Sequence, residues 1–270
     1  MKILFCGDVV GKAGRKLVLS CLPKLKEQLN LDFIIVNGEN AAHGFGINPK
    51  IYQAFLDHGT DVVTLGNHSF DKTDIFPILN EADNIIRPMN YPENTVGKGF
   101  CVLTTNKGVR VAVVQLLGSV FMRSVESPFL SIQAWLQTHK RGQDYDVLIV
   151  DFHAEATAEK VALGHYLDGH ASLVVGTHTH IPTADAHILP SGTAYMTDVG
   201  MCGDYDSVIG MKKEMAFPRF LGGDKRGRLE PAEKNATFCA VCVEIDEKTG
   251  VAKEIFPVRV GQTLENTHEV

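Results

Sequence analysis

The sequence lacks a surplus of positive charge. Its 26 lysine and arginine residues stand against 32 aspartate and glutamate residues, so the formal net charge of the 270-residue chain is −6. Proteins that read DNA sequence usually carry a basic patch or stripe. A DNA partner is therefore not expected. An enzyme of this composition that acts on phosphates would need local positive charge, which metal ions can supply.

Long apolar runs are also missing. The N-terminus has only a short apolar run before Gly7 and Asp8. A signal peptide needs a longer apolar region followed by a cleavage site of small residues. A membrane-spanning helix needs roughly 18 or more consecutive apolar residues, and no stretch approaches that length. The sequence therefore predicts a cytoplasmic protein that does not contact a membrane.

Cysteine is present but not in the patterns that carry chemistry. Of six cysteines, only Cys239 and Cys242 form a C-x-x-C pair, inside the apolar run TFCAVCVEI. A thiolate zinc site would need a second pair, and a redox site would need a helix start after the first cysteine. The run is typical of a strand, which places residues three apart on opposite faces. We expect these cysteines to be reduced and structural, as cytosolic thiols usually are.

What the sequence does contain is an alternation of apolar runs, glycine-containing turns and helical patterns, which indicates an α/β fold. The continuous runs of valine, isoleucine and leucine lack polar alternation, which is typical of parallel strands covered by helices on both faces. These runs are residues 2–7, 32–38, 61–66, 110–118, 146–153 and 172–178. The helical patterns between them are residues 17–29, 48–58, 71–82, 127–139 and 154–167. The C-terminal third has short β-like runs joined by turns, which predict antiparallel strands.

We expect residues 1–270 to form a single domain, because no linker or repeat interrupts this alternation. The most irregular stretch, residues 200–234, is rich in glycine, methionine and charge. A loop of that length in a compact domain is usually functional or disordered. We interpret about 201–234 as a lid or cap over a site. Basic residues in this stretch, such as Lys212, Lys213 and Arg219, either neutralise a phosphate or form a solvated surface. His43, outside this stretch, either approaches a substrate phosphate or is a polar loop residue.

Polar residues that can bind metals follow the ends of five predicted strands. In open parallel sheets this is the edge where ligands bind. The residues are Asp8, then Glu39 and Asn40, then Asn67 and His68, then His153, and finally His178 and His180. Carboxylate and amide oxygens favour hard cations, and imidazole suits iron, manganese and zinc. One carboxylate such as Glu39 can bridge two metals about 3.5–4 Å apart. The pattern predicts a two-metal site.

These motifs and their order resemble the calcineurin-like metallophosphoesterases. The matching motifs are Gly7-Asp8, Gly38-Glu39-Asn40, Gly66-Asn67-His68, the lone His153, and Gly176-Thr-His178-Thr-His180. Two departures narrow the resemblance: Val10 stands where the superfamily usually has a histidine, and Glu39 stands where it usually has aspartate. With the segments GDVVGKAGR, VNGENAAHGFGI, LGNHSFD, GTHTHIPTAD and MTDVGMCG, these departures look like the YmdB-like family of 2′,3′-cyclic nucleotide phosphodiesterases.

The resemblance implies a layered metallophosphoesterase fold and two metal ions per chain. Iron or manganese are expected first, with zinc or magnesium as alternatives. It would assign Asp8, Glu39, Asn40 and His180 to one metal. It would assign Glu39, Asn67, His153 and His178 to the other. The implied reaction is hydrolysis of a small cyclic nucleotide by a metal-activated hydroxide. His68 would not ligate a metal but would protonate the leaving oxygen as the general acid.

Three other functions stay open from the sequence. A phosphomonoesterase or a nuclease could use the same framework, so RNA ends are a second candidate substrate. A non-catalytic regulatory protein could keep the metal site for stability or nucleotide sensing. The presence of His68 favours catalysis, because a purely structural site has no use for an acid beside the metals. A homo-oligomer is compatible with the sequence, which does not determine the number of copies.

Overall fold

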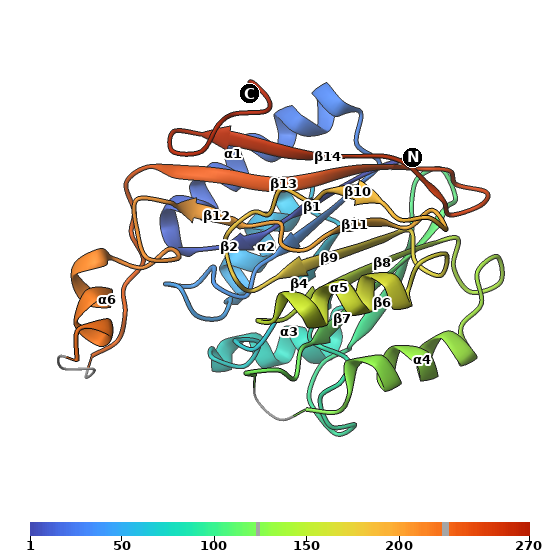
Figure 1. The fold of residues 1–270 in the computed structure, drawn as a ribbon, viewed down its shortest axis with the longest axis horizontal. Coiled ribbons are helices and arrows are strands. Elements are labelled where there is room, and N and C mark those ends of the chain that lie inside the picture. The colour runs from blue at the N-terminus through green and yellow to red at the C-terminus, as the bar shows by residue number, and fades with distance from the viewer. Residues whose placement is uncertain (123–124, 223–226) are drawn as a thin grey trace.

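The computed structural model describes residues 1–122, 125–222 and 227–270, and these form two β-sheets with helices outside them (Figure 1). The first sheet has the strand order β2-β12-β13-β1-β3-β4-β5, with β14 paired to β13. Its strands are β1 (Lys2–Cys6), β2 (Asp8–Val9), β3 (Phe33–Asn37), β4 (Val62–Thr64), β5 (Ile85–Ile86), β12 (Met201–Asp204), β13 (Ala236–Ile245) and β14 (Ala252–Gly261). Strands β1, β3, β4 and β5 are parallel, β13 is antiparallel to β1, and β14 is antiparallel to β13.

The second sheet has the order β10-β11-β9-β8-β7-β6. Its strands are β6 (Phe100–Thr104), β7 (Arg110–Leu117), β8 (Val147–His153), β9 (Leu173–Thr177), β10 (His187–Ile188) and β11 (Ala194–Met196). The central strands β7, β8, β9 and β11 are parallel, and β6 and β10 are antiparallel edges. The expected α/β fold with mainly parallel strands is therefore confirmed.

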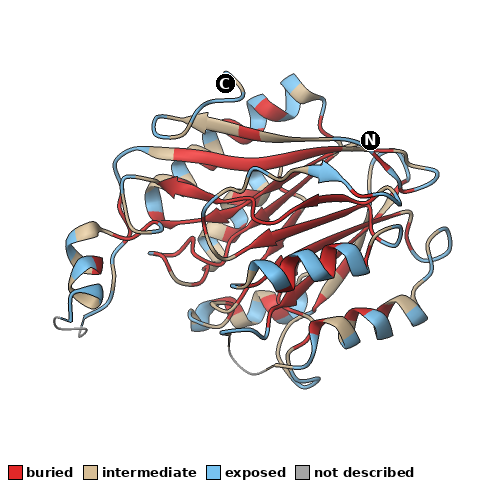
Figure 2. Cartoon of the chain, in the orientation of Figure 1, coloured by how far each residue is buried: buried red, intermediate tan, exposed pale blue. Residues whose placement is uncertain are grey.

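Three apolar cores explain why the strands are apolar on both faces. One core lies between the two sheets and joins residues such as Phe5 and Ile35 to Val113 and Ile149. A second lies between the first sheet and the helices α1 (Gly11–Leu29), α2 (Pro49–Asp57) and α3 (Phe76–Glu81). A third lies between the second sheet and the helices α4 (Pro128–Thr138) and α5 (Thr157–Tyr166). The result is a four-layered arrangement with buried strands and outward-facing helical surfaces (Figure 2).

Local sequence signals set several helix boundaries. The side chain of Asn48 accepts a hydrogen bond from the amide of Ile51, and Pro49 follows as the first helical residue, as expected at a helix start. The predicted helix over 71–82 is shorter than expected. It consists of the 3₁₀ turn η1 (Thr73–Ile75) followed by α3, in which Pro77 lies in the first turn. Proline is tolerated there because the first amides of a helix have no intrahelical partner.

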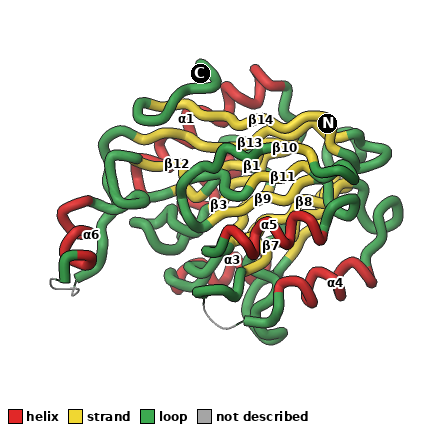
Figure 3. Tube along the Cα trace, in the orientation of Figure 1, coloured by secondary structure: helices red, strands yellow, loops and turns green. Residues whose placement is uncertain are grey.

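The irregular stretch after residue 200 was expected to have no regular structure, and this was wrong for two segments. Strand β12 is buried and pairs with both β2 and β13. Its sequence, MCGD, has no β-branched residue, so this strand depends on its tertiary partners rather than on local propensity. Helix α6 (Lys213–Phe220) lies at the edge of the molecule with loops at both ends (Figure 3). The expected lid also includes residues 223–226, which lie outside the described residues.

Two further expectations concern the C-terminal third and the cysteines. Strand β11 is parallel to β9, which differs from the antiparallel arrangement expected there, because the chain crosses over before it rejoins the second sheet. All six cysteines lie in the described part of the chain and are buried free thiols, as predicted.

Among the described helices, none is long and apolar enough to cross a membrane.

Candidate metal centre

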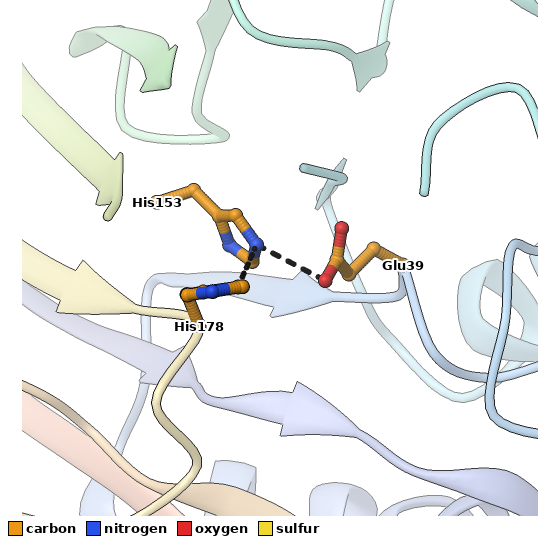
Figure 4. A group of neighbouring side chains, drawn as sticks. All are labelled: Glu39, His153 and His178. Carbon is orange, nitrogen blue, oxygen red and sulfur yellow. Dashed lines mark hydrogen bonds and ion pairs between the residues drawn. The ribbon is translucent and has the colours of Figure 1, made fainter. Parts of the chain in front are cut away.

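The parallel strands of both sheets end at the same edge, and the polar residues that follow them meet there. Three of these residues, Glu39, His153 and His178, have ligand atoms that all lie within 4.8 Å of one another. Figure 4 shows the three side chains pointing toward one another, with dashed lines from the His153 ring to each of the other two. Its Nε2 atom lies 3.0 Å from Oε1 of Glu39 and 3.1 Å from Nδ1 of His178. This donor group could hold a metal ion.

The spacing around Nε2 of His153 fits donors that share one cation. The Oδ1 atom of Asn67 lies 3.0 Å from the same nitrogen. Nitrogen and oxygen ligands bind small divalent ions at about 2.0–2.2 Å, so two donors at right angles around an octahedral ion are about 3 Å apart. One imidazole nitrogen cannot form good hydrogen bonds with a carboxylate, an amide oxygen and a second imidazole at once. A cation at this point would satisfy all four groups.

Asp8 supplies a second sign of a cation site. Its side chain is fully buried, and its Oδ1 atom has no hydrogen-bond partner among the described residues. Its Oδ2 atom accepts a hydrogen bond of 3.2 Å from the amide of His178. Burial raises the pKa of Asp8 to about 6, against the opposing effect of His180 and His153. A buried carboxylate oxygen without a partner is costly unless a cation binds it, so this residue fits a metal ligand.

Asn40 and His180 lie close to each other and to Asp8. Nε2 of His180 is 3.2 Å from Oδ1 of Asn40 and 4.0 Å from Oδ1 of Asp8. Nδ1 of His180 donates to the backbone oxygen of Ile209 at 2.8 Å. This hydrogen bond places the proton on Nδ1 and leaves Nε2 as the nitrogen that can bind a metal.

The electrostatic balance of the group favours added positive charge. Burial would raise the pKa of Glu39, but the neighbouring His153 and His68 lower it to about 2. Burial would lower the pKa of His153, but Glu39 and Asp8 raise it to about 9. Burial and the nearby His153 together lower the pKa of His178 to about 3. The carboxylates thus attract a cation, and His178 presents a neutral ring to it.

Backbone geometry brings these side chains close together. His178 and His180 both adopt left-handed backbone conformations, with φ of 95° and 66°. Such conformations are uncommon for residues other than glycine and cluster at functional sites. Gly66 is also required, because a Cβ atom there would lie 2.2 Å from Oε2 of Glu39 and 2.6 Å from Nε2 of His153. The glycine before Asn67 therefore makes room for the donor atoms.

His68 lies beside the donor group but its ring has other partners. Its Nδ1 atom is 2.8 Å from Oδ2 of Asp71, and its ring packs edge-on against Phe45 with centroids 5.1 Å apart. Its backbone amide donates to Oε2 of Glu39 at 3.0 Å. The Asp71 contact orients the ring and leaves Nε2 as the nitrogen available to a substrate.

Three supporting residues were not predicted from the sequence. Thr177 accepts a hydrogen bond from Nδ1 of His153 at 2.9 Å and donates to Oδ1 of the buried Asp151 at 2.7 Å. These two hydrogen bonds place the proton of His153 on Nδ1 and direct Nε2 to the donor group. Glu155 lies 3.0 Å from Nε2 of His178 and orients that ring in the same way. A lone aspartate within an apolar strand run is the signal that could have indicated Asp151.

A cavity of about 300 Å³ opens beside the donor group. Its inner wall includes Glu39, Asn40, His68, His178 and His180, and Arg219 of α6 lies on the outer wall. Lys212 and Lys213 do not line it, and each is instead paired with a surface acid, Glu230 and Asp206 respectively. His43 lies in a neighbouring hollow of about 630 Å³ with Lys72 and Arg228. Of the basic residues left open by the sequence, Arg219 alone reaches this cavity in the described structure.

Known proteins resemble this chain over almost all of its length. The YmdB-like protein family matches residues 4–258. The chain is 46% identical over 255 residues to the 2′,3′-cyclic-nucleotide 2′-phosphodiesterase of Bacillus subtilis (strain 168), which covers 94% of this chain and 95% of that protein. Two crystal structures each match with a TM-score of 0.90. One is a hypothetical protein from Thermus thermophilus, with 41% identity and coverage of 97% of this chain and 100% of that one. The other is a novel phosphatase from Mycoplasma pneumoniae, with 36% identity and coverage of 97% and 93%.

Proposed function

Because the chain belongs to the YmdB-like protein family, we propose that it is a metal-dependent phosphodiesterase that hydrolyses 2′,3′-cyclic nucleotides. The observation that carries the proposal is the convergence of Glu39, Asn67 and His178 on Nε2 of His153, next to His68. The name of the relative from Bacillus subtilis and its 46% identity support the same substrate class.

The donor atoms support two metal ions per chain. Glu39, Asn67, His153 and His178 would hold one ion, and Asp8, Asn40 and His180 would hold the other together with Glu39. These mixed nitrogen and oxygen donors suit iron or manganese, with zinc or magnesium as alternatives. When bound, a pair of metals polarises the phosphoryl oxygens and lowers the pKa of a water that becomes the nucleophile. The carboxylates of Asp8 and Glu39 balance the added charge.

His68 would act as the general acid. Its Nδ1 contact with Asp71 orients the ring, and the residue lines the cavity beside the donor group. In the reaction, the bond between phosphorus and one ribose oxygen breaks, and that oxygen takes the proton from His68. A positioned acid of this kind contributes on the order of 10²–10⁴-fold to the rate. The other ribose oxygen keeps the phosphate, so the product is a nucleotide with one phosphomonoester.

Helix α6 and its flanking loops would form the described part of a lid over this site. The helix supplies Ala216, Arg219 and Phe220 to the cavity wall, opposite the donor group. A cover of this kind limits the access of water and holds the substrate during the reaction.

The test is a substrate panel assayed after reconstitution with iron, manganese or zinc. The panel contains 2′,3′-cyclic and 3′,5′-cyclic nucleotides, a nitrophenyl phosphate monoester and a short RNA. We expect the highest kcat/KM with the 2′,3′-cyclic nucleotides and loss of turnover with a chelator. Faster turnover of the monoester or the RNA would instead support a phosphomonoesterase or a nuclease. No turnover of any substrate, with metal bound, would support a regulatory protein.

A further inference from the structure

We propose that the outer wall of the 300 Å³ cavity, formed around Phe45 and Phe220, is a subsite for the nucleobase of the substrate. This inference rests on the proposed function, because it assumes that the phosphate binds at the donor group. The subsite would set the preference of the enzyme for nucleotides over other cyclic phosphodiesters.

The cavity has two chemically different walls. The inner wall carries His68 and four of the proposed metal ligands, whereas the outer wall carries Phe45, Ile209, Met211, Phe220 and Leu229. Among the described residues of the outer wall there is no carboxylate, and Arg219 is the one cation. The volume of about 300 Å³ lies at the lower end of the range for small-molecule sites. The outer wall therefore suits a flat, apolar group of limited size.

Phe45 is held in a fixed orientation at the junction of the two walls. The guanidinium carbon of Arg228 lies 4.9 Å from the centroid of its ring, a cation–π contact. The ring of His68 meets it at 79°, with centroids 5.1 Å apart. An aromatic ring fixed next to the proposed acid can position a ligand with little loss of conformational entropy.

Phe220 also lines the outer wall and is strongly exposed. Its exposed fraction is 79%, and that of the neighbouring Ile209 is 50%. Burial of an aromatic side chain is strongly favourable, so a ligand in the cavity would gain binding free energy by covering Phe220. The adjacent Arg219 is tethered by a 2.8 Å hydrogen bond from Nη2 to the backbone oxygen of Gly227.

The shape of a 2′,3′-cyclic nucleotide matches this arrangement. Its cyclic phosphate and its base are attached to different edges of the ribose, so a phosphate at the inner wall leaves the base one sugar ring away. Bases stack on aromatic side chains and on guanidinium groups whatever their identity, because each base has a π-face. Phe220 and Arg219 offer both kinds of surface at the outer wall.

The experiment compares two substrates that share the reacting ring. They are 2′,3′-cyclic AMP and glycerol 1,2-cyclic phosphate, which has the same five-membered cyclic diester but no base. Replacing Phe220→Ala should raise KM for cyclic AMP about tenfold, the scale of one lost stacking contact. We expect kcat for cyclic AMP, and kcat/KM for the glycerol ester, to change little. The variant Phe220→Trp should restore KM, because it restores the stacking surface.

Phe217 on the same helix is the matched control. It is 49% exposed and is not among the residues that line the cavity, so Phe217→Ala should leave both substrates unaffected. Equal losses on both substrates, or a change in oligomeric state by light scattering, would show that Phe220 contacts another copy or supports the fold, and would overturn the subsite. An unchanged KM for cyclic AMP would overturn it as well. If the parent enzyme hydrolyses neither substrate, the proposed function itself fails, which is a distinct outcome.

Discussion

Nζ of Lys160 lies 2.7 Å from Oδ2 of Asp198, and neither side chain is more than 1% exposed. The same oxygen accepts hydrogen bonds from the hydroxyl of Thr179 at 2.6 Å and from its amide at 3.2 Å. In sequence, Thr179 lies between the two histidines of the candidate metal centre, His178 and His180, whose backbones are both left-handed. The ion pair therefore supports the turn that presents these rings.

Replacing Lys160→Met keeps the length of the side chain but leaves Asp198 buried without its counter-charge. Removing one partner of a buried pair typically costs about 3–5 kcal/mol. We expect a loss of unfolding free energy of this order in denaturant titrations, together with weaker metal binding. Lys98→Met is the matched control, because the Lys98–Asp83 pair is exposed and should contribute less than about 1 kcal/mol. Equal effects of the two substitutions would rule out a special role for the buried pair.

Replacing Glu39→Gln preserves size and removes the charge proposed to hold two cations together. We expect near-complete loss of phosphodiesterase activity while the circular dichroism spectrum stays that of the parent. The metal content measured after reconstitution should fall from about two ions per chain in the parent toward one in the variant. Activity within about tenfold of the parent, or a parent with one ion and full activity, would contradict the bridging role.

The hydrogen-bonded chain from Asp151 through Thr177 to His153 predicts a graded effect on metal affinity. Thr177→Val removes the hydroxyl that fixes the His153 ring, and loss of such a supporting contact typically costs roughly 10- to 100-fold in metal affinity. Thr177→Ser keeps the hydroxyl and should retain an affinity close to that of the parent. Competition with a fluorescent chelator measures the metal affinity of both variants. Equal affinities for Thr177→Val and Thr177→Ser would argue against a role for these hydrogen bonds.

The strands and the donor residues follow from local patterns, but their supporting contacts do not. Runs such as residues 146–153 and 172–178 predict buried strands because valine and isoleucine fill both faces. Parallel strands end at one edge, so residues such as Asp8 and His153 could be placed together without coordinates. The division of the strands between two sheets could not be predicted, because periodicity shows that a strand is buried but not which strand lies beside it.

The pairing of strands that are distant in sequence accounts for the other features that the sequence did not reveal. The link between Asp151 and Thr177 depends on the pairing of β8 with β9, which places Asp151 opposite Val175. Strand β12 exists because β2 and β13 flank it. Neither relationship is encoded in the residues that immediately surround it in sequence.

The proposed lid predicts a pattern of proteolysis. Helix α6 ends at the exposed Phe220 and Leu221, and it has one buried residue, Ala216. Segments with few buried contacts open at low free-energy cost and are cut first. We expect the first tryptic cuts within residues 201–234, and bound nucleotide product should slow them. Identical cutting rates with and without product would count against a lid.

The sharpest prediction separates the proposed acid from the metal ligands by leaving-group chemistry. A ribose hydroxyl leaves as a poorly stabilised alkoxide and needs a proton as the bond breaks, whereas a nitrophenolate leaves without one. His68→Ala should therefore slow hydrolysis of a 2′,3′-cyclic nucleotide on the order of 10²–10⁴-fold. It should slow hydrolysis of a nitrophenyl phosphodiester much less. His165→Ala, an exposed position on α5, is the control and should affect neither substrate.

Metal content distinguishes the two ways in which His68 could matter. If His68 were a ligand, its removal should lower metal content and slow both substrates alike, because the same metals serve both. If it is the acid, metal content should stay at the parent value, since the donor atoms around His153 do not include the His68 ring. Its backbone amide, which bonds Glu39, is retained in the alanine variant. Comparable losses on both substrates with unchanged metal content would falsify the acid role and leave the two-metal proposal standing, because the nucleophile and the charge stabilisation do not depend on this ring.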